Sequence, residues 1–316
     1  MSRRNLVAVL VALALLVGAG AVVGFTTGTV GRVLGDEAPR AATAGSRTRS
    51  PAAPSASSRT TSPVVPPVLP SPGYYLALGD SLAAGFQNGV DHRTEGYVGA
   101  VRKAVDKRHQ GPTELVNLAC SGETTTTMLD GGGCTYDRGT QLAEAEKFLH
   151  DHAGQVQLVT LDIGGNDVAR CGFGGLKPSC TTPALATLSG NLPQITSRLR
   201  KAAPGVQVVV LNYYDPFLVL DLLGSSGLGQ TSVTELAKVN GVIAKSARTS
   251  SAQVADVASA FQTTVRTPMT VTDIGKVPTN LARILQWTWM APPRFDFHAN
   301  DTGYAVMARA VVAQLR

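Results

Sequence analysis

Residues 73–316 of this 316-residue chain carry almost no net charge. The whole chain has 28 Lys and Arg against 22 Asp and Glu, but seven of the basic and two of the acidic residues precede residue 73. That leaves 21 basic and 20 acidic side chains in the longer part. Because nucleic-acid binding depends on clustered positive charge, the composition gives no support to a nucleic-acid partner.

The chain also lacks a CxxC pair, and none of its cysteines has a histidine at the spacing of a metal ligand. A metal site is therefore not expected, and neither is another cofactor. The four cysteines fall into two close pairs, which fits export to an oxidising compartment. Four cysteines allow three connectivities, and the sequence alone does not choose among them. We favour Cys120–Cys134 and Cys171–Cys180, because each bond would close a Gly-rich loop.

Large apolar side chains are nearly absent from residues 36–72, which consist mostly of Ala, Ser, Thr, Pro and Arg. Such a segment cannot bury enough surface to offset its ordering entropy, so we expect a disordered linker. In residues 1–35, Arg3 and Arg4 precede an uncharged, almost wholly apolar run of twenty residues, Leu6–Phe25. This run is long enough to cross a bilayer, and we interpret residues 1–35 as a signal peptide or an N-terminal membrane anchor.

Cleavage and retention of the apolar run are both compatible with the sequence. Ala19-Gly20-Ala21 is a site that a signal peptidase could cut, whereas continuation of the run to Phe25 is typical of an uncleaved anchor. Either case predicts an extracytoplasmic protein, secreted or tethered to the outer face of the cytoplasmic membrane. Membrane contact through this segment is expected only if the segment is retained.

Residues 73–316 have the length of a single α/β domain. The overall composition, 44% hydrophobic and 16% charged, is that of a globular protein. Short β-rich runs are predicted to be strands at Tyr74–Leu78, Leu115–Leu118, Val156–Leu161, Val206–Leu211 and Val254–Val257. Helical spacing occurs near Tyr97–Arg108, Gln141–His150, Leu185–Ala203, Val233–Ser250 and Gly303–Leu315. This alternation predicts a flavodoxin-like three-layer α/β/α sandwich with a parallel five-stranded sheet, whose ligands bind beyond the carboxyl ends of the strands.

A serine follows the first predicted strand, in Gly79-Asp80-Ser81-Leu82. A serine at a strand-to-helix turn has an exposed hydroxyl and can lie at a helix N-terminus, where the dipole favours developing negative charge. This position suits a nucleophile. The alternative is that Ser81 only caps a helix.

Three further polar motifs follow in order along the chain. They are Asn117-Leu118-Ala119-Cys120-Ser121-Gly122-Glu123-Thr124, Asp162-Ile163-Gly164-Gly165-Asn166-Asp167 and His298-Ala299-Asn300-Asp301-Thr302-Gly303-Tyr304. Together with the serine motif they resemble the four blocks of the GDSL esterase/lipase family, also called SGNH hydrolases, and in particular its exported bacterial type. The resemblance covers residues 73–316, which it implies are an SGNH hydrolase catalytic domain.

The resemblance implies a role for each matching residue. Ser81 would be the nucleophile and His298 the general base, while the oxyanion hole would consist of the backbone N–H groups of Ser81 and Gly122 and the side-chain amide of Asn166. Ester hydrolysis by a serine requires the same residue types. The hydroxyl needs a neighbouring base to take its proton, and the tetrahedral oxyanion needs fixed hydrogen-bond donors. Gly122 would let the backbone approach closely. Taken singly, Gly122 and Asn166 are also common turn residues.

The sequence departs from the family pattern at the acid. The usual position, three residues before the histidine, holds Phe295, and the nearest acid is Asp296, two residues before His298. We expect Asp296 to hold the imidazole in its tautomer, although a backbone carbonyl could do the same. Asp80 and Asp167 are expected to fix their loops through backbone hydrogen bonds.

Aromatic residues make up only 5% of the chain, yet Trp287 and Trp289 stand close together upstream of His298. A second apolar run begins with Phe217 and Leu218 after the fourth predicted strand. Phe295 and Phe297 belong to the same aromatic cluster as the two tryptophans. These aromatic residues, with Phe217 and Leu218, could wall a pocket for an acyl chain, or they could belong to ordinary core packing.

We therefore expect a monomeric, exported serine ester hydrolase that cleaves small-molecule or lipid esters with a hydrophobic acyl chain through an acyl-enzyme on Ser81. One alternative is an O-acetyl esterase acting on cell-wall or plant polysaccharide, which would need a shallow polar site. Another is a catalytically silent surface-binding module, because export and a spacer also suit adhesion.

Overall fold

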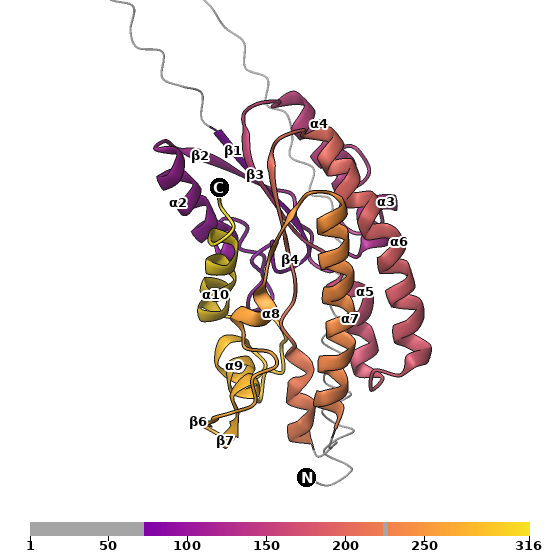
Figure 1. Ribbon diagram of the computed structural model, residues 1–316, viewed down its shortest axis with the longest axis vertical. Coiled ribbons are helices and arrows are strands. Elements are labelled where there is room, and N and C mark those ends of the chain that lie inside the picture. The colour runs from indigo at the N-terminus through magenta and orange to yellow at the C-terminus, as the bar shows by residue number, and fades with distance from the viewer. Residues whose placement is uncertain (1–72, 224–226) are drawn as a thin grey trace, which may run out of the picture.

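The computed structural model describes residues 73–223 and 227–316 (Figure 1). The predicted signal peptide or anchor at 1–35 and the predicted linker at 36–72 lie outside the described residues. Among the helices of the described part, none is both long and apolar enough to cross a membrane.

Five parallel strands form the central sheet, in the order β2-β1-β3-β4-β5. Their bounds are β1 Gly73–Gly79, β2 Thr113–Asn117, β3 Val156–Asp162, β4 Gln207–Leu211 and β5 Gln253–Ala255. Each coincides within a few residues with a predicted strand. The parallel five-stranded sheet is therefore confirmed, and the carboxyl ends of all five strands lie at one end of the molecule.

Helices cover both faces of the sheet (Figure 1). One layer contains α2 (Gly96–His109), α8 (Val257–Ala260) and α10 (Asp301–Val312). The other contains α3 (Thr125–Asp130), α4 (Gln141–Asp151), α5 (Gly165–Phe173), α6 (Pro178–Ala202) and α7 (Leu228–Thr249). This arrangement confirms the predicted three-layer architecture.

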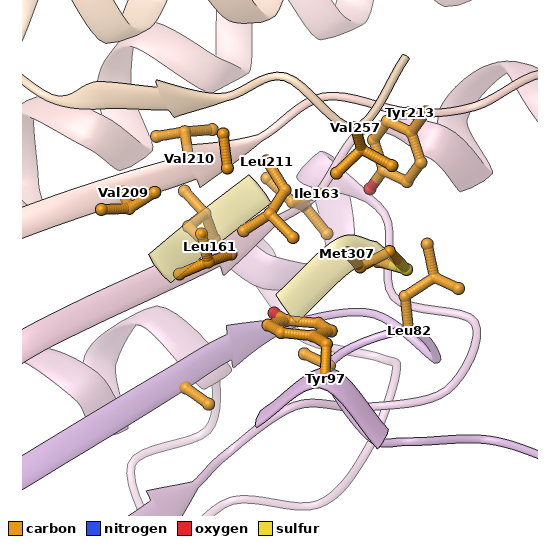
Figure 2. Close-up of a cluster of buried hydrophobic side chains, with 14 of the residues drawn as sticks. Leu82, Tyr97, Leu161, Ile163, Val209, Val210, Leu211, Tyr213, Val257 and Met307 are labelled. Carbon is orange, nitrogen blue, oxygen red and sulfur yellow. The ribbon is translucent and has the colours of Figure 1, made fainter. Parts of the chain in front are cut away.

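The strands are apolar along most of their length because helices bury them from both sides. Leu161 of β3, Val209 of β4 and Met307 of α10 are fully buried in one continuous core. Figure 2 shows part of this core, including Leu82 from the turn after β1 and Tyr213 from the segment after β4. Residues at the carboxyl ends of the strands are therefore anchored by the same packing that holds the layers together.

Several elements differ from the prediction. Helix α6 begins at Pro178 and not near Leu185. Proline is favourable at the first position of a helix, because the N–H that it lacks would have no partner within the helix. The sequence patterns also missed the 3₁₀ helix η2 (Pro216–Leu223), the hairpin strands β6 (Met269–Thr272) and β7 (Gly275–Pro278), and α9 (Thr279–Trp287). These short elements lie beyond the carboxyl ends of the strands, and η2 contributes Pro216 and Phe217 to the lining of the candidate site.

Candidate active site

Ser81 lies in a tight turn at the carboxyl end of β1. The turn is closed by hydrogen bonds from Ala84 N–H to Asp80 C=O (3.0 Å) and from Phe86 N–H to Ser81 C=O (2.9 Å). The next helix, α2, begins only at Gly96, so the expectation that Ser81 lies at a helix N-terminus is wrong. The turn itself supplies fixed backbone N–H groups near this hydroxyl.

Gly79 fixes the start of that turn. Its backbone has φ +136°, and a Cβ there would lie 2.1 Å from the carbonyl oxygen of Asp162 at the end of β3. The following N–H, of Asp80, donates to that same carbonyl (3.0 Å). The ends of β1 and β3 therefore approach too closely for any side chain at residue 79.

Ser81, His298 and Asp296 form a hydrogen-bonded relay. The Ser81 Oγ lies 2.8 Å from His298 Nε2, and His298 Nδ1 lies 2.6 Å from Asp296 Oδ1. Asp296 Oδ1 also accepts a hydrogen bond from the His298 backbone N–H (3.0 Å), which fixes the carboxylate to the loop. The carboxylate of Asp296, two residues before His298, thus reaches the imidazole ring. Phe295, which occupies the usual position of the acid, has a left-handed backbone conformation with φ +50°.

The environment of His298 keeps Asp296 ionised. Burial raises the pKa of Asp296, but the hydrogen bond and the charge of His298 outweigh it, so that the pKa lies below its ordinary value. An ionised Asp296 accepts a hydrogen bond from His298 Nδ1–H, and this leaves Nε2 unprotonated and able to take the Ser81 proton. The rings of Phe86 and Phe297, each with its centroid 4.4 Å from that of the imidazole, restrict its orientation. Ser81 and His298 are 6% and 8% exposed.

Gly122 and Asn166 lie beyond the ends of β2 and β3. Gly122 has φ +85°, a backbone conformation that explains the glycine, and a Cβ there would meet no protein atom within 4 Å. Asn166 belongs to the first turn of α5, and its Nδ2 donates to the Glu123 carbonyl (2.9 Å). One amide hydrogen remains available, and within residues 73–223 and 227–316 no acceptor is hydrogen-bonded to the N–H of Ser81 or Gly122.

Both disulfides have the expected pairing. Cys120–Cys134 closes the loop that carries Gly122, and Cys171–Cys180 ties α5, which carries Asn166, to the start of α6. Disulfides persist in oxidising compartments, so they support an extracytoplasmic location.

Gln141, which the sequence analysis missed, connects the serine turn to the Gly122 loop. Its buried side chain accepts from Gly79 N–H (2.7 Å) and donates to Gly79 C=O (3.0 Å) and Glu123 Oε2 (3.2 Å). Burial raises the pKa of Glu123, so a neutral amide is a suitable partner for it. The only signal in the sequence was a glutamine at the first position of a predicted helix, 62 residues from Gly79.

Asp80 and Asp167 stabilise loops, as predicted. Asp80 accepts hydrogen bonds from Leu82 N–H (2.9 Å) and from the Tyr213 hydroxyl (2.8 Å). Asp167 accepts from Thr125 N–H (2.9 Å) and thereby joins α5 to α3. Neither carboxylate contacts the Ser81 hydroxyl through a hydrogen bond in the described part of the chain.

A cavity with about 710 Å³ of empty space, part of it open to solvent, borders Ser81 and Asn166. Its walls are mainly apolar: Leu82, Val168, Ala169, Leu176, Pro216, Phe217, Leu236, Val239 and Phe297. The described residues contain no group of three His, Cys, Asp or Glu side chains that could hold a metal ion. The arrangement suits an apolar ligand whose reacting group lies at Ser81.

Of the predicted pocket residues, Phe217 and Phe297 line this cavity. Leu218 is 2% exposed and packs in the core, while Trp287 packs edge-on against Phe261. Trp289 supports the histidine loop, because its backbone N–H donates to His298 C=O (3.0 Å) and its ring is covered by Arg294. Helix α7 contributes Leu236 and Val239 to the cavity wall. It was predicted as a helix but not as part of a site.

Asp215, also missed from the sequence, borders the cavity as a buried carboxyl group. Burial raises its pKa to about 7. The Ser232 hydroxyl donates to Asp215 Oδ2 (2.8 Å), and Phe217 N–H donates to Asp215 Oδ1 (3.0 Å). Both hydrogen bonds lower the pKa of Asp215, but the effect of burial is larger.

Comparison with known proteins agrees with this geometry. Residues 77–306 match the GDSL-like Lipase/Acylhydrolase family. Among solved structures, the chain is similar to the lipase Lip_vut3 from a goat rumen metagenome, with 18% identity, a TM-score of 0.51, and coverage of 77% of this chain and 100% of that one. It is also similar to phospholipase A1 from Streptomyces albidoflavus, with 19% identity, a TM-score of 0.51, and coverage of 77% and 100%.

An acetylxylan esterase from Geobacillus stearothermophilus has 15% identity, a TM-score of 0.49, and coverage of 77% of this chain and 94% of that one. Comparison with curated protein sequences gave no match. At these identities, the two structures with the higher scores establish the fold alone.

Replacing Gln141 with Ala should destabilise the fold. The buried Gly79 N–H would lose its partner and a small cavity would remain, so we expect the free energy of unfolding to fall by about 2–4 kcal/mol in urea titration. Gln194→Ala, on the exposed face of α6, is the control and should change it by less than about 0.5 kcal/mol. Equal effects of the two changes would contradict the role assigned to Gln141.

Asp215 should make stability fall as the pH rises. Its pKa is about 7 in the folded chain against an ordinary value of 3.8, so between these values the unfolded chain releases a proton that the folded chain keeps. Asp215→Asn cannot ionise, and relative to the unmodified protein it should gain about 1–4 kcal/mol between pH 4 and pH 8. Urea titrations at both pH values measure this, with the exposed Asp130→Asn as control. A gain that is the same at pH 4 and pH 8 would show that Asp215 titrates normally.

Proposed function

Because the chain belongs to the GDSL-like lipase/acylhydrolase family, it is a carboxylic ester hydrolase, and we propose that its substrates are esters of hydrophobic acyl groups. The reaction would proceed through an acyl-enzyme on Ser81. The observation that carries this proposal is the relay from Ser81 through His298 to Asp296 at the edge of an apolar cavity.

In the acylation step, His298 Nε2 takes the Ser81 proton while Ser81 Oγ bonds to the ester carbonyl carbon. The Nδ1–H bond to Asp296 holds the ring in the required tautomer and stabilises the imidazolium that forms. Collapse of the tetrahedral intermediate breaks the bond to the alcohol oxygen, which leaves with the proton from Nε2. The acyl group then remains on Ser81.

In the deacylation step, a water molecule replaces the alcohol. His298 Nε2 takes a proton from the water as its oxygen bonds to the acyl carbon. The bond between the acyl carbon and Ser81 Oγ then breaks, Oγ takes the proton from Nε2, and the carboxylic acid leaves. The reaction returns every proton, so the chain needs no cofactor for it.

The oxyanion of each intermediate would be stabilised by three N–H donors. The backbone groups of Ser81 and Gly122 and the second hydrogen of the Asn166 amide have no acceptor among the described residues, so they can turn to a developing negative charge without breaking an existing bond. Preorganised donors of this kind contribute about 3–4 kcal/mol each to transition-state stabilisation.

The apolar cavity walls favour a hydrophobic acyl group over the O-acetyl group of a polysaccharide. An acetyl group would leave most of the apolar walls exposed, and a polysaccharide would need polar partners. The catalytic residues also argue against a silent binding module. In this proposal, the domain at 73–316 catalyses the hydrolysis. Residues 1–72 direct export and separate the domain from the membrane.

Ser81→Ala should abolish ester hydrolysis while leaving the fold intact. The hydroxyl carries the covalent step and contributes little to packing, so kcat should fall by at least about 10³-fold with an unchanged circular dichroism spectrum and Tm. A serine-directed phosphonate should label the unmodified chain at Ser81 and leave the variant unlabelled. Ser189→Ala, an exposed serine of α6, should keep full activity. Substantial residual hydrolysis by Ser81→Ala would refute the assignment.

The acyl pocket should appear as a dependence of kcat/KM on chain length. Each methylene group that enters the cavity contributes up to about 0.8 kcal/mol, or about fourfold, until the cavity ends. Leu236→Trp should narrow the cavity and lower kcat/KM for octanoyl esters at least tenfold while sparing acetyl esters, because Leu236 lines the wall without touching the relay.

Leu236→Met, which keeps nearly the same volume, is the matched control and should retain the unmodified profile. Preference of the unmodified protein for acetyl esters, with equal losses for all chain lengths in Leu236→Trp, would favour the polysaccharide O-acetyl esterase instead.

A further inference from the structure

Exposed apolar side chains gather on the β6–β7 hairpin. Of the six large hydrophobic residues that are exposed in the described part of the chain, four lie within ten residues of one another: Val265 (38%), Met269 (52%), Val271 (69%) and Ile274 (49%). We call these four the hairpin patch. Apolar clusters of this kind on a protein surface commonly mark an interaction site.

The hairpin has one face that packs on the domain and one that does not. Thr270 and Val277 are paired in register on the inner face, where Val277 is buried and the Thr270 hydroxyl is hydrogen-bonded to Thr279 at the start of α9 (3.1 Å). Met269, Val271 and Lys276 alternate with them and are exposed. Packing against the domain therefore explains the residues on the inner face of the hairpin, whereas the apolar side chains on the outer face contribute nothing to the core.

Basic residues outnumber acidic ones in the segment that contains the hairpin patch. Residues 264–294 contain Arg266, Lys276, Arg283 and Arg294 but only one acid, Asp273, although residues 73–316 as a whole are nearly neutral. Arg266 and Lys276 are exposed, and neither has an ion-pair partner within the ranges that the structure describes. Exposed apolar side chains beside unpaired cations are typical of proteins that bind the surface of an anionic bilayer.

The hairpin also lies near the candidate site. It packs on α9, which packs on η2, whose Phe217 lines the cavity, and the chain leaving α9 leads to His298. Figure 1 shows β6, β7 and α9 at the end of the molecule toward which the parallel strands run. A surface bound by the hairpin would therefore be close to the cavity.

We propose that the hairpin patch docks the domain on an anionic lipid bilayer, with Met269, Val271 and Ile274 inserted among the headgroups and Arg266 and Lys276 facing their phosphates. A second copy of the chain is the less suitable occupant. Symmetric pairing would bring the same unpaired cations together, and four side chains fall far short of the roughly 800 Å² that each partner buries in a stable dimer. Docking does not depend on the proposed reaction, so either can fail without the other.

The test places a fluorescent reporter on the hairpin of the full chain. Ile274→Trp and, as a second reporter, Val271→Trp are each combined with Ser81→Ala, so that hydrolysis cannot alter the lipid. With vesicles of phosphatidylcholine and phosphatidylglycerol, each reporter should be shifted to the blue and quenched by brominated acyl chains, relative to the same chain without the added Trp. Val312→Trp is the control, because it lies at the end of α10 away from the hairpin (Figure 1) and should show neither effect. The signal is local, so membrane binding by residues 1–72 does not produce it.

Removing the charges separates the two parts of the proposal. Arg266→Gln with Lys276→Gln should weaken the quenching of the Ile274→Trp reporter about thirtyfold in lipid concentration, and so should vesicles of phosphatidylcholine alone. Equal quenching at positions 274 and 312, or none at 274 and 271, would overturn the proposal. So would a blue shift without lipid that accompanies a doubling of mass in light scattering, because the occupant would then be a second copy.

Discussion

The close approach of β1 to β3 at their carboxyl ends is the constraint on which the candidate site depends. Gly79 has no room for a side chain beside the Asp162 carbonyl, and the Gln141 amide binds both backbone groups of Gly79 from the other side. The turn that carries Ser81 is therefore held by backbone contacts on two sides before any catalytic contact is made. His298 and Asp296 need only meet a hydroxyl whose position is already fixed.

The strands and the main helices could be predicted because each depends on a local pattern. The contact between Ser81 and His298, which are 217 residues apart, was predicted only because their motifs resemble those of the GDSL esterase/lipase family. Apolar runs predict buried strands, and Asp296 lies close enough along the chain to reach His298. The role of Gln141 could not be predicted, because it follows from packing across 62 residues of chain. The prediction of the cavity walls was largely wrong for the same reason. Trp289 is near His298 in sequence but supports its loop, whereas Leu236 of α7 is distant from His298 in sequence and lines the cavity.

Aspartates around the site differ in charge although they are the same residue type. Burial raises the pKa of Asp80 and Asp215, whose partners are neutral hydroxyl and N–H groups. Asp296 is also partly buried, yet its pKa is lowered because it alone of the three is hydrogen-bonded to an imidazole. The fold thus favours the ionised form of the carboxyl group that orients the base, Asp296, and disfavours the ionised form of Asp80 and Asp215.

The chain order of the relay has a consequence for biosynthesis. Ser81 and His298 are 217 residues apart, and the helix that follows His298 completes one layer over the sheet. A chain that has emerged only as far as α9 holds the nucleophile but neither its base nor the last covering helix. The hydrolase therefore cannot cleave esters while it is still being synthesised, and its activity begins only when the domain has closed.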